Sequence, residues 1–458
     1  MKTNPPMRKC LFTILMVILG FSFSQAQEVA QLTLNESILY AIENNYVTKN
    51  ARLETLISKA TVKETTAQGL PQIDGSFNVD YNPKIPVVFL PNEPPFGDPS
   101  NPSDVLPARF GVSYSSGLGV TVSQMIFDGS FFIGLRAAKT LTQLTDFDLV
   151  KAENDVVENV KKAYFGVMVN QERIRLAESN LSRIDSLLKE TKALNEAGFA
   201  EKIEVSRIQV QRNNAYSQVE RSRTAWEISK ELLKIQMGMP LTVEIHITET
   251  LQELNPREEL IQLLAEEGES RVELDQLNTQ IALQHYDLKY NTSQYMPTIN
   301  FNGNIRRSGA GNELNTVFDK VNWFGSSLLG VSVQIPIFDG LAKSARIQKN
   351  RYTISQLENQ RFYMKDSFTN EVFSAKASLK NDLNILDVQR ENLELAQEVF
   401  DIAKIKYQEG VGSNLEVIDA DGALTEAEIN YLAALYDGLI SKVNLEKALG
   451  LLKADLED

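Results

Sequence analysis

The sequence predicts a mainly α-helical protein that also carries a transmembrane β-barrel portion. Two unrelated motifs recur along the 458 residues at nearly one offset, 211 and 212 residues, which indicates an internal duplication. Four segments alternate polar and apolar residues with the period of a strand, whereas the longest segments show the 3.5-residue period of coiled coils. Beyond residue 26 no apolar run is long enough for a spanning helix, so strands would have to make any membrane crossing.

The N-terminus is predicted to be a secretory signal peptide, residues 1–26. Lys2, Arg8 and Lys9 precede a 13-residue apolar run that is followed by Ser24-Gln25-Ala26, small residues at the spacing of a cleavage site. A membrane anchor would need about 20 apolar residues. We therefore expect an exported product that lacks Cys10, the single cysteine of the chain.

Two motifs define the duplication. Phe127-Asp128-Gly129 recurs as Phe338-Asp339-Gly340, and Gly198 followed by Glu204-Val205 recurs as Gly410 followed by Glu416-Val417. The first copy carries about 15 extra residues within 82–107, a stretch that holds eight of the fifteen prolines. Because proline cannot donate to a sheet or continue a helix, we expect an irregular loop there.

Each copy is predicted to run helix, strand, strand, long helix, tight turn, helix. In the first, Thr33 and Glu36 form a capping box that opens the first helix. The first repeat (27–238) has helices over about 35–68, 129–197 and 199–236 and strands over about 71–82 and 108–127. An inter-repeat segment (239–257) leads to the second repeat (258–452). This repeat has helices over about 258–295, 341–409 and 413–452 and strands over about 297–307 and 326–338. A C-terminal tail (453–458) follows it.

The two long helices carry coiled-coil seams. Apolar residues such as Val156, Val160, Ile184 and Leu188 are spaced alternately three and four apart. A helix of about 69 residues spans roughly 100 Å, whereas each return helix covers roughly half of that length. The uncovered half would be filled by the helix over 258–295 or by the one that ends at Gln68.

The four strands share one apolar and one polar face. Four strands cannot close a membrane barrel, whose smallest form has eight, so other copies must contribute. A dimer would supply eight strands and a trimer twelve, and the largely Ser, Gly, Thr, Asn and Gln inner face favours the wider barrel. Four aromatic residues near the loop ends form either a membrane girdle or ordinary strand packing: Phe110, Tyr114, Trp323 and Phe324.

Composition argues against several functional classes. With 46 basic and 60 acidic residues, a formal charge of −14, the chain lacks the basic surface of a nucleic-acid binder. One cysteine and two histidines are too few for a Cys/His zinc site. Neither His246 nor His285 is predicted to meet a nucleophile, so we expect no enzyme, no cofactor and no metal site.

Together, the repeated plan, the Ile-Phe-Asp-Gly junctions, and Tyr407 and Gly410 followed by Glu416 and Asp419 resemble the TolC-like outer-membrane efflux family over residues 28–452. The resemblance implies a homotrimer with a twelve-stranded barrel in outer-membrane lipid and a long coiled-coil α-barrel in the periplasm. It also implies docking of a periplasmic adaptor, a membrane fusion protein, that belongs to an inner-membrane pump.

The resemblance further assigns site residues. The adaptor-docking tips are Gly198, Phe199 and Ala200 in the first repeat and Gly410, Val411 and Gly412 in the second. The aperture residues are Glu416, Asp419 and Tyr407, together with Glu204 and Lys202. The basic residue that the family has two positions after the second tip glycine is here Gly412, so a salt-bridge latch is absent or uses another cation such as Lys202.

The predicted function is that of a passive duct in a tripartite efflux or type I secretion system. Within the family, an outlet dedicated to protein secretion or to metal-ion export is the alternative. A soluble secreted coiled-coil scaffold would explain the heptads but not the alternating strands.

Overall fold

The computed structural model describes residues 29–95, 97, 104–251, 256–266, 268 and 271–452. The predicted signal peptide and the predicted tail lie outside these residues. The chain divides into two compact units. The first unit takes the described residues of Met1–Arg52, Asp148–Leu274 and Met364–Asp458, and the second takes those of Leu53–Phe147 and Asp275–Tyr363. Each unit therefore draws on both predicted repeats.

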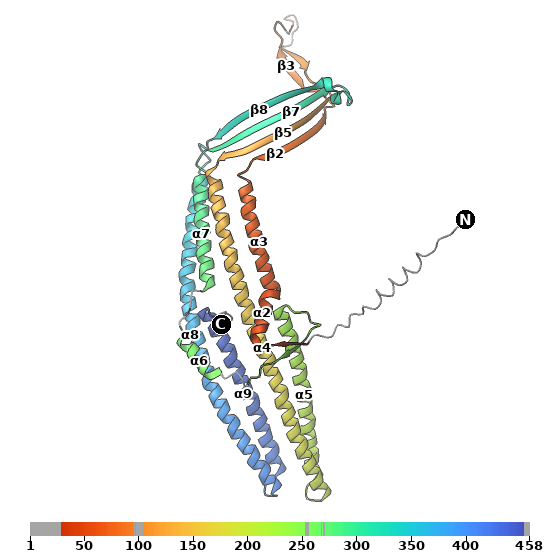
Figure 1. The fold of residues 1–458 in the computed structure, drawn as a ribbon, viewed down its shortest axis with the longest axis vertical. Coiled ribbons are helices and arrows are strands. Elements are labelled where there is room, and N and C mark those ends of the chain that lie inside the picture. The colour runs from red at the N-terminus through yellow and green to blue at the C-terminus, as the bar shows by residue number, and fades with distance from the viewer. Residues whose placement is uncertain are drawn as a thin grey trace, which may run out of the picture. The chain divides into compact units, whose positions relative to one another are not determined.

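A four-stranded antiparallel sheet forms the β portion of the second unit (Figure 1). Its order is β2 (Gln72–Tyr81), β5 (Tyr114–Phe127), β7 (Thr298–Gly311) and β8 (Trp323–Gln334). The register places Phe77 opposite Leu118, and Phe301 opposite Val331. Apolar side chains thus gather on one face, as the period-2 alternation predicts. The last strand ends at Gln334 instead of reaching residue 338, because Pro336 has no N–H to donate.

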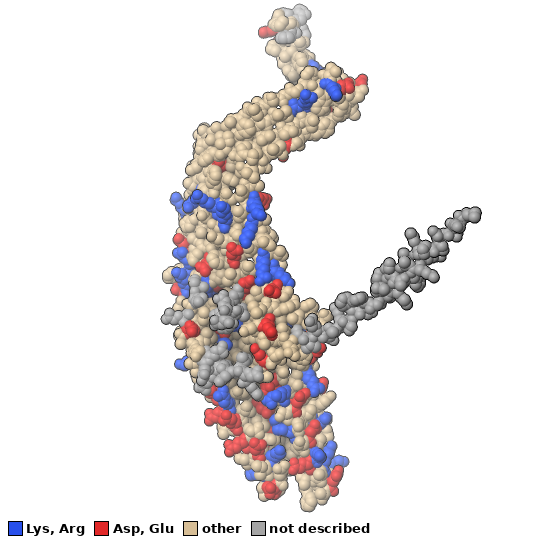
Figure 2. Space-filling view, in the orientation of Figure 1, with Lys and Arg blue, Asp and Glu red and all other residues tan. Residues whose placement is uncertain are grey.

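Charged side chains are rare on this sheet. The face seen in Figure 2 is nearly free of Lys, Arg, Asp and Glu, whereas the helices of the first unit carry both signs. No helix among the described residues combines the length and the apolar character that crossing a membrane requires.

Two strands lie in the proline-rich insertion, so the prediction of an irregular loop over 82–107 was wrong for these residues. Strands β3 (Val87–Pro91) and β4 (Val105–Arg109) form an antiparallel pair in which Pro91 lies opposite Val105. In a two-stranded ribbon each strand has a free edge, so a proline that points its ring nitrogen outward loses no ladder hydrogen bond.

A second short sheet lies in the first unit. Strand β1 (Val29–Leu32) pairs in parallel with β6 (Glu244–Ile247), which lies in the predicted inter-repeat segment. The hydroxyl of Tyr164 donates to the Leu32 carbonyl at 3.2 Å and to Glu249 Oε2 at 2.8 Å. These bonds tie the small sheet to the long helix that contains Tyr164.

The predicted helix over 35–68 is two helices, α2 (Leu34–Asn44) and α3 (Tyr46–Ala67). The predicted capping box of Thr33 and Glu36 opens α2. Asn45 interrupts the helix with an extended backbone, φ −61° and ψ 140°. Its Oδ1 accepts the Val47 N–H at 2.7 Å and its Nδ2 donates to the Gln236 carbonyl at 2.6 Å. These side-chain hydrogen bonds compete with the helical ones, which explains the break.

The predicted helix over 258–295 is also divided, into α6 (Pro256–Ala265) and α7 (Val272–Ser293). Arg271, just before α7, is buried and donates to Glu371 at 2.6 Å and to Glu273 at 2.8 Å. These two contacts satisfy the buried guanidinium at the start of α7.

Two helical hairpins complete the described fold, and their turns belong to the first unit. Helix α4 (Gly129–Glu196) leads into α5 (Lys202–Met237), and α8 (Ala342–Gln408) leads into α9 (Asn414–Leu449). Val156, Val160 and Ile184 of the predicted α4 seam are at most 4% exposed. In the second unit, Ser58 of α3 lies 2.9 Å from Thr145 of α4, oxygen to oxygen, so the helix that ends near Gln68 lies along the first long helix.

Candidate functional site

The turns of the two hairpins have the same backbone geometry. Gly198 and Gly410 have φ of +80° and +74°, in the left-handed region that favours glycine. The residue after each glycine donates its N–H to a carbonyl five positions back: Phe199 to Leu194 at 2.8 Å, and Val411 to Lys406 at 3.0 Å. This is the Schellman pattern of a helix C-terminus, and it satisfies carbonyls that the helix itself leaves free.

Both turns present an apolar side chain to solvent. Phe199 is 83% exposed and Val411 is 76% exposed. Ala200 is half-buried, and its carbonyl accepts a hydrogen bond from Asn195 Nδ2 at 2.7 Å. The tips named from the sequence are therefore tight turns from which Phe199 and Val411 point into solvent.

Gly412 is tightly packed, which accounts for the missing basic residue at this position. Its N–H donates to the Lys406 carbonyl at 2.9 Å. A Cβ at Gly412 would lie 2.9 Å from Cβ of Lys406 and 3.0 Å from the backbone nitrogen of Tyr407. A larger residue would force this turn apart.

A hydrophobic cluster lies behind the tips and joins all four helices. It contains Ile184 and Leu188 of α4, Ile208 of α5, Phe400 of α8 and Leu424 of α9, among others. Packing of this kind holds the two hairpins together as one body.

Tyr407 lies at the edge of this cluster and links α8 to α4. Its hydroxyl is 3.0 Å from Oγ1 of Thr191, and both side chains are buried. Burial raises the pKa of Tyr407, and the nearby Glu204 and Glu190 raise it further against the opposing effect of the Thr191 hydrogen bond. The phenol therefore stays neutral at physiological pH.

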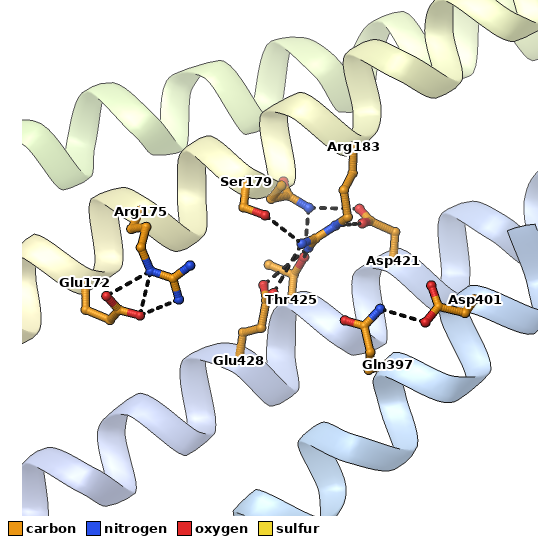
Figure 3. Close-up of polar contacts among 10 residues, drawn as sticks. Glu172, Arg175, Ser179, Arg183, Gln397, Asp401, Asp421, Thr425 and Glu428 are labelled. Atoms are coloured by element: carbon orange, nitrogen blue, oxygen red, sulfur yellow. Dashed lines mark hydrogen bonds and ion pairs between the residues drawn. The ribbon is translucent and has the colours of Figure 1, made fainter. Parts of the chain in front are cut away.

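A charged cluster next to the hydrophobic one was not predicted from the sequence (Figure 3). Arg183 of α4 donates from Nε to Asp421 at 2.8 Å and from Nη1 and Nη2 to Glu428 at 3.1 and 3.2 Å, both carboxylates being on α9. Asn180 donates to the second oxygen of Asp421 at 2.8 Å and to Thr425 at 2.8 Å.

This cluster is largely shielded from water. The Arg183, Asp421 and Glu428 side chains are 18%, 6% and 11% exposed. Desolvation by itself lowers the pKa of the Arg183 guanidinium, but the hydrogen bonds and charges of Glu428 and Asp421 outweigh it and raise the pKa above its usual value. Arg183 is therefore a permanent cation that joins the two hairpins.

In the single chain, the predicted aperture acids lie on the exposed surface and do not form a cluster with the other predicted aperture residues. Glu416 and Asp419 are both exposed, and the Glu416 N–H donates to the Ser413 hydroxyl at 3.2 Å as part of the α9 cap. Lys202 is exposed and Glu204 is half-buried. Within the described ranges, Lys202 forms no ion pair with these acids. Helices α4 and α9 are joined by Arg183 near the turns and, further along, by the Lys161–Glu446 and Lys447–Glu158 pairs.

The sequence carries a faint signal for the charged cluster. Arg183 directly precedes the seam residue Ile184, and Asp421 directly follows the seam residue Ala420, so both flank coiled-coil seams where charges pair between helices. The local sequence pattern does not show that these two seams pack against each other. Among the described residues no group of three or more His, Cys, Asp or Glu is arranged to hold a metal ion.

Comparisons with known proteins agree with this architecture. A family model described as outer membrane efflux protein matches residues 40–238 and 263–451. The outer membrane efflux protein BepC of Brucella suis is 20% identical over 447 residues, which cover 96% of this chain and 90% of BepC. TolC of Escherichia coli is 21% identical over 357 residues, covering 74% of this chain and 70% of TolC.

The fold resembles solved channels as well. The crystal structure of VceC from Vibrio cholerae superimposes with a TM-score of 0.68 at 14% identity, covering 91% of this chain and 96% of VceC. Because the family model extends over most of the sequence, the chain belongs to the outer membrane efflux protein family and is an efflux channel of the outer membrane.

Proposed function

We propose that three copies of this chain assemble into a passive duct that carries substrates from an inner-membrane pump and its periplasmic adaptor out of the cell. The three sheets close into a twelve-stranded barrel in outer-membrane lipid, and the helices form a tube in the periplasm. The known relatives support the channel role, and the exposed surfaces of the single chain support the assembly.

The observation that carries the proposal is the open apolar sheet. Its edge strands β2 and β8 each have one side without a partner strand in the four-stranded order. On the apolar face Ile73, Phe77 and Leu329 are 69%, 61% and 73% exposed. Lipid does not tolerate an open strand edge, and water disfavours a bare apolar face of this size. Pairing β8 of one copy with β2 of the next removes the edges and leaves lipid to cover the face.

The helices offer a matching argument. Helix α8 exposes Val388, Leu395, Val399 and Ile402 by 49% to 55%, at the three- and four-residue spacing of a second seam. Helix α5 exposes Val210, Ile228, Leu232 and Ile235. An exposed seam of this kind is completed by a helix from a neighbouring copy.

The hairpin ends form the periplasmic aperture in this proposal. Threefold symmetry brings three copies of Glu416 and Asp419 around one axis, with Glu204 and Lys202 nearby. Tyr407 with Thr191, and Arg183 with Asp421 and Glu428, hold the two hairpins of each chain in the narrow state. The tips at Phe199 and Val411 receive the adaptor, whose binding favours a wider state.

Light scattering of the detergent-solubilised protein tests the assembly. The expected protein mass is three times that of one chain. Replacing Leu395 and Val399 together with Asp should yield smaller species, whereas Arg390→Glu on another face of α8 should leave the trimer intact. A stable monomer of the unaltered protein would contradict the proposal.

A further inference from the structure

The four strands of the large sheet contain four charged residues: Asp74, Asp80, Arg306 and Arg307. Successive residues of a strand point to opposite faces. Arg306 therefore shares the polar face with Asn304 and Ser308, and the register places Asp74 and Asp80 of β2 on this face too. Arg307 shares the apolar face with Ile305. In the trimeric duct proposed above, the polar face lines the lumen and the apolar face contacts lipid.

Arg306 has a defined position on the polar face. Its Nη2 donates to Oδ1 of Asn78 on β2 at 3.3 Å, and reaching that strand requires crossing β5. The crossing point is Gly117, where an added Cβ would lie 2.5 Å from Nη2 of Arg306 and 2.6 Å from the Asn78 oxygen. The glycine thus leaves the space that the guanidinium occupies.

The charge of Arg306 is not cancelled by a direct partner. Asn78 donates from its Nδ2 to Asp80, so a neutral amide stands between the guanidinium and that carboxylate. Across the part of the chain that the structure describes, Arg306 forms no ion pair. The residues in register beside it, Gly119 and Ser326, are small, so the guanidinium remains exposed to the space above the sheet.

We propose that Arg306 is a specificity-determining residue of the duct, a fixed positive site in the lumen that raises the passage of anionic solutes against the opposite effect of Asp74 and Asp80 on the same face. This inference rests on the proposed trimeric channel, in which three copies of Arg306 form a ring. Rings of Arg or Lys select anions in pores as rings of Asp or Glu select cations. The site differs in sign and in location along the chain from the aperture acids Glu416 and Asp419.

The test is the ratio of potassium to chloride permeability, measured from reversal potentials under a KCl gradient in planar bilayers. All variants carry Glu416→Gln and Asp419→Asn, so that the aperture acids do not dominate the ratio. Arg306→Gln should raise the ratio by about two-fold at low salt and by less at high salt, because ions screen charges within about 10 Å at 0.1 M. Arg306→Lys should keep the parent ratio.

Arg307→Gln is the matched control, since it removes the same charge from the adjacent residue on the other face. It should leave the ratio unchanged. A parent-like ratio in Arg306→Gln, or an equal shift in Arg306→Lys, would overturn the assignment of Arg306 while leaving the duct intact. A protein that forms no pore at all would overturn the duct and the assignment with it.

Discussion

Arg183 illustrates how one side chain can link two hairpins. It comes from α4, yet its carboxylate partners Asp421 and Glu428 lie on α9, 238 and 245 residues further along the chain. Its guanidinium also lies 5.7 Å from the centre of the Phe400 ring, on α8. A buried guanidinium is tolerated only with such a complete set of partners, and removing one partner leaves the others unpaired.

We expect Arg183→Met to lower the free energy of unfolding by about 2 to 3 kcal/mol, because it leaves two poorly exposed carboxylates without their cationic partner. The matched control is Arg175→Met, on the same helix, whose guanidinium is 60% exposed and pairs with Glu172 one turn away. That change should cost about 0.5 kcal/mol or less. Denaturant unfolding in detergent measures both, and equal losses would show that the Arg183 cluster has no special role in stability.

At the scale of elements, the two helical hairpins repeat one turn. Each ends a long helix with a glycine of positive φ, satisfies the last carbonyls with backbone N–H groups, and leaves one apolar residue in solvent. The equivalence extends to the seams behind them, which contribute Ile184 and Ile208 from one hairpin and Phe400 and Val417 from the other. The hairpin, and not the single helix, is therefore the unit that presents a tip.

Substituting Phe199→Asp or Val411→Asp should abolish transport while leaving the assembled protein intact. Both side chains are exposed, so neither change removes core packing, whereas each places a charge on a surface proposed to bind the adaptor. Efflux of a fluorescent substrate, together with co-purification of the adaptor, measures the effect.

Leu241→Asp serves as the control, since Leu241 is 54% exposed and lies outside both tips. Transport should persist in this variant. Undiminished efflux in the two tip variants would remove these turns from the docking surface.

At the scale of the whole molecule, the single chain is incomplete. Its four-stranded sheet has two open edges, and the proposed aperture acids Glu416 and Asp419 are exposed. In the proposed trimer, symmetry closes these edges and brings copies of these acids around one axis. Six carboxylates around one axis would repel one another, attract cations and bind divalent ions through oxygen.

Neutralising both acids, Glu416→Gln with Asp419→Asn, should therefore weaken cation selectivity and block by divalent ions in single-channel recordings. A smaller effect is expected on folding, because both side chains are in solvent. Glu220→Gln with Glu227→Gln removes the same charge from exposed positions of α5 and should change neither property. Identical selectivity and divalent sensitivity in the wild type and the aperture variant would place Glu416 and Asp419 on an ordinary solvated surface.

The sequence alone determined the features that depend on local pattern. Alternating residues such as Phe77 and Leu118 identified the strands of the large sheet, the heptads of α4 identified its buried face, and Thr33 with Glu36 identified the start of α2. The tip glycines were identified in the same way, because only a few residues allow the backbone that a tight turn requires. Each of these features depends on residues that are close in the sequence.

The tertiary structure decided everything that depends on residues far apart in the sequence. Asn45 breaks a helix because its amide reaches Gln236, and β1 is a strand because β6 pairs with it. Arg183 is tolerated in a partly buried position because α9 supplies its carboxylates. The proline-rich insertion contains strands because β3 pairs with β4, which lies further along the chain. The periodicity of a segment shows which of its faces is apolar, but it does not show which distant segment will pack against that face. The partners of long-range hydrogen bonds and ion pairs are therefore known only from the folded structure.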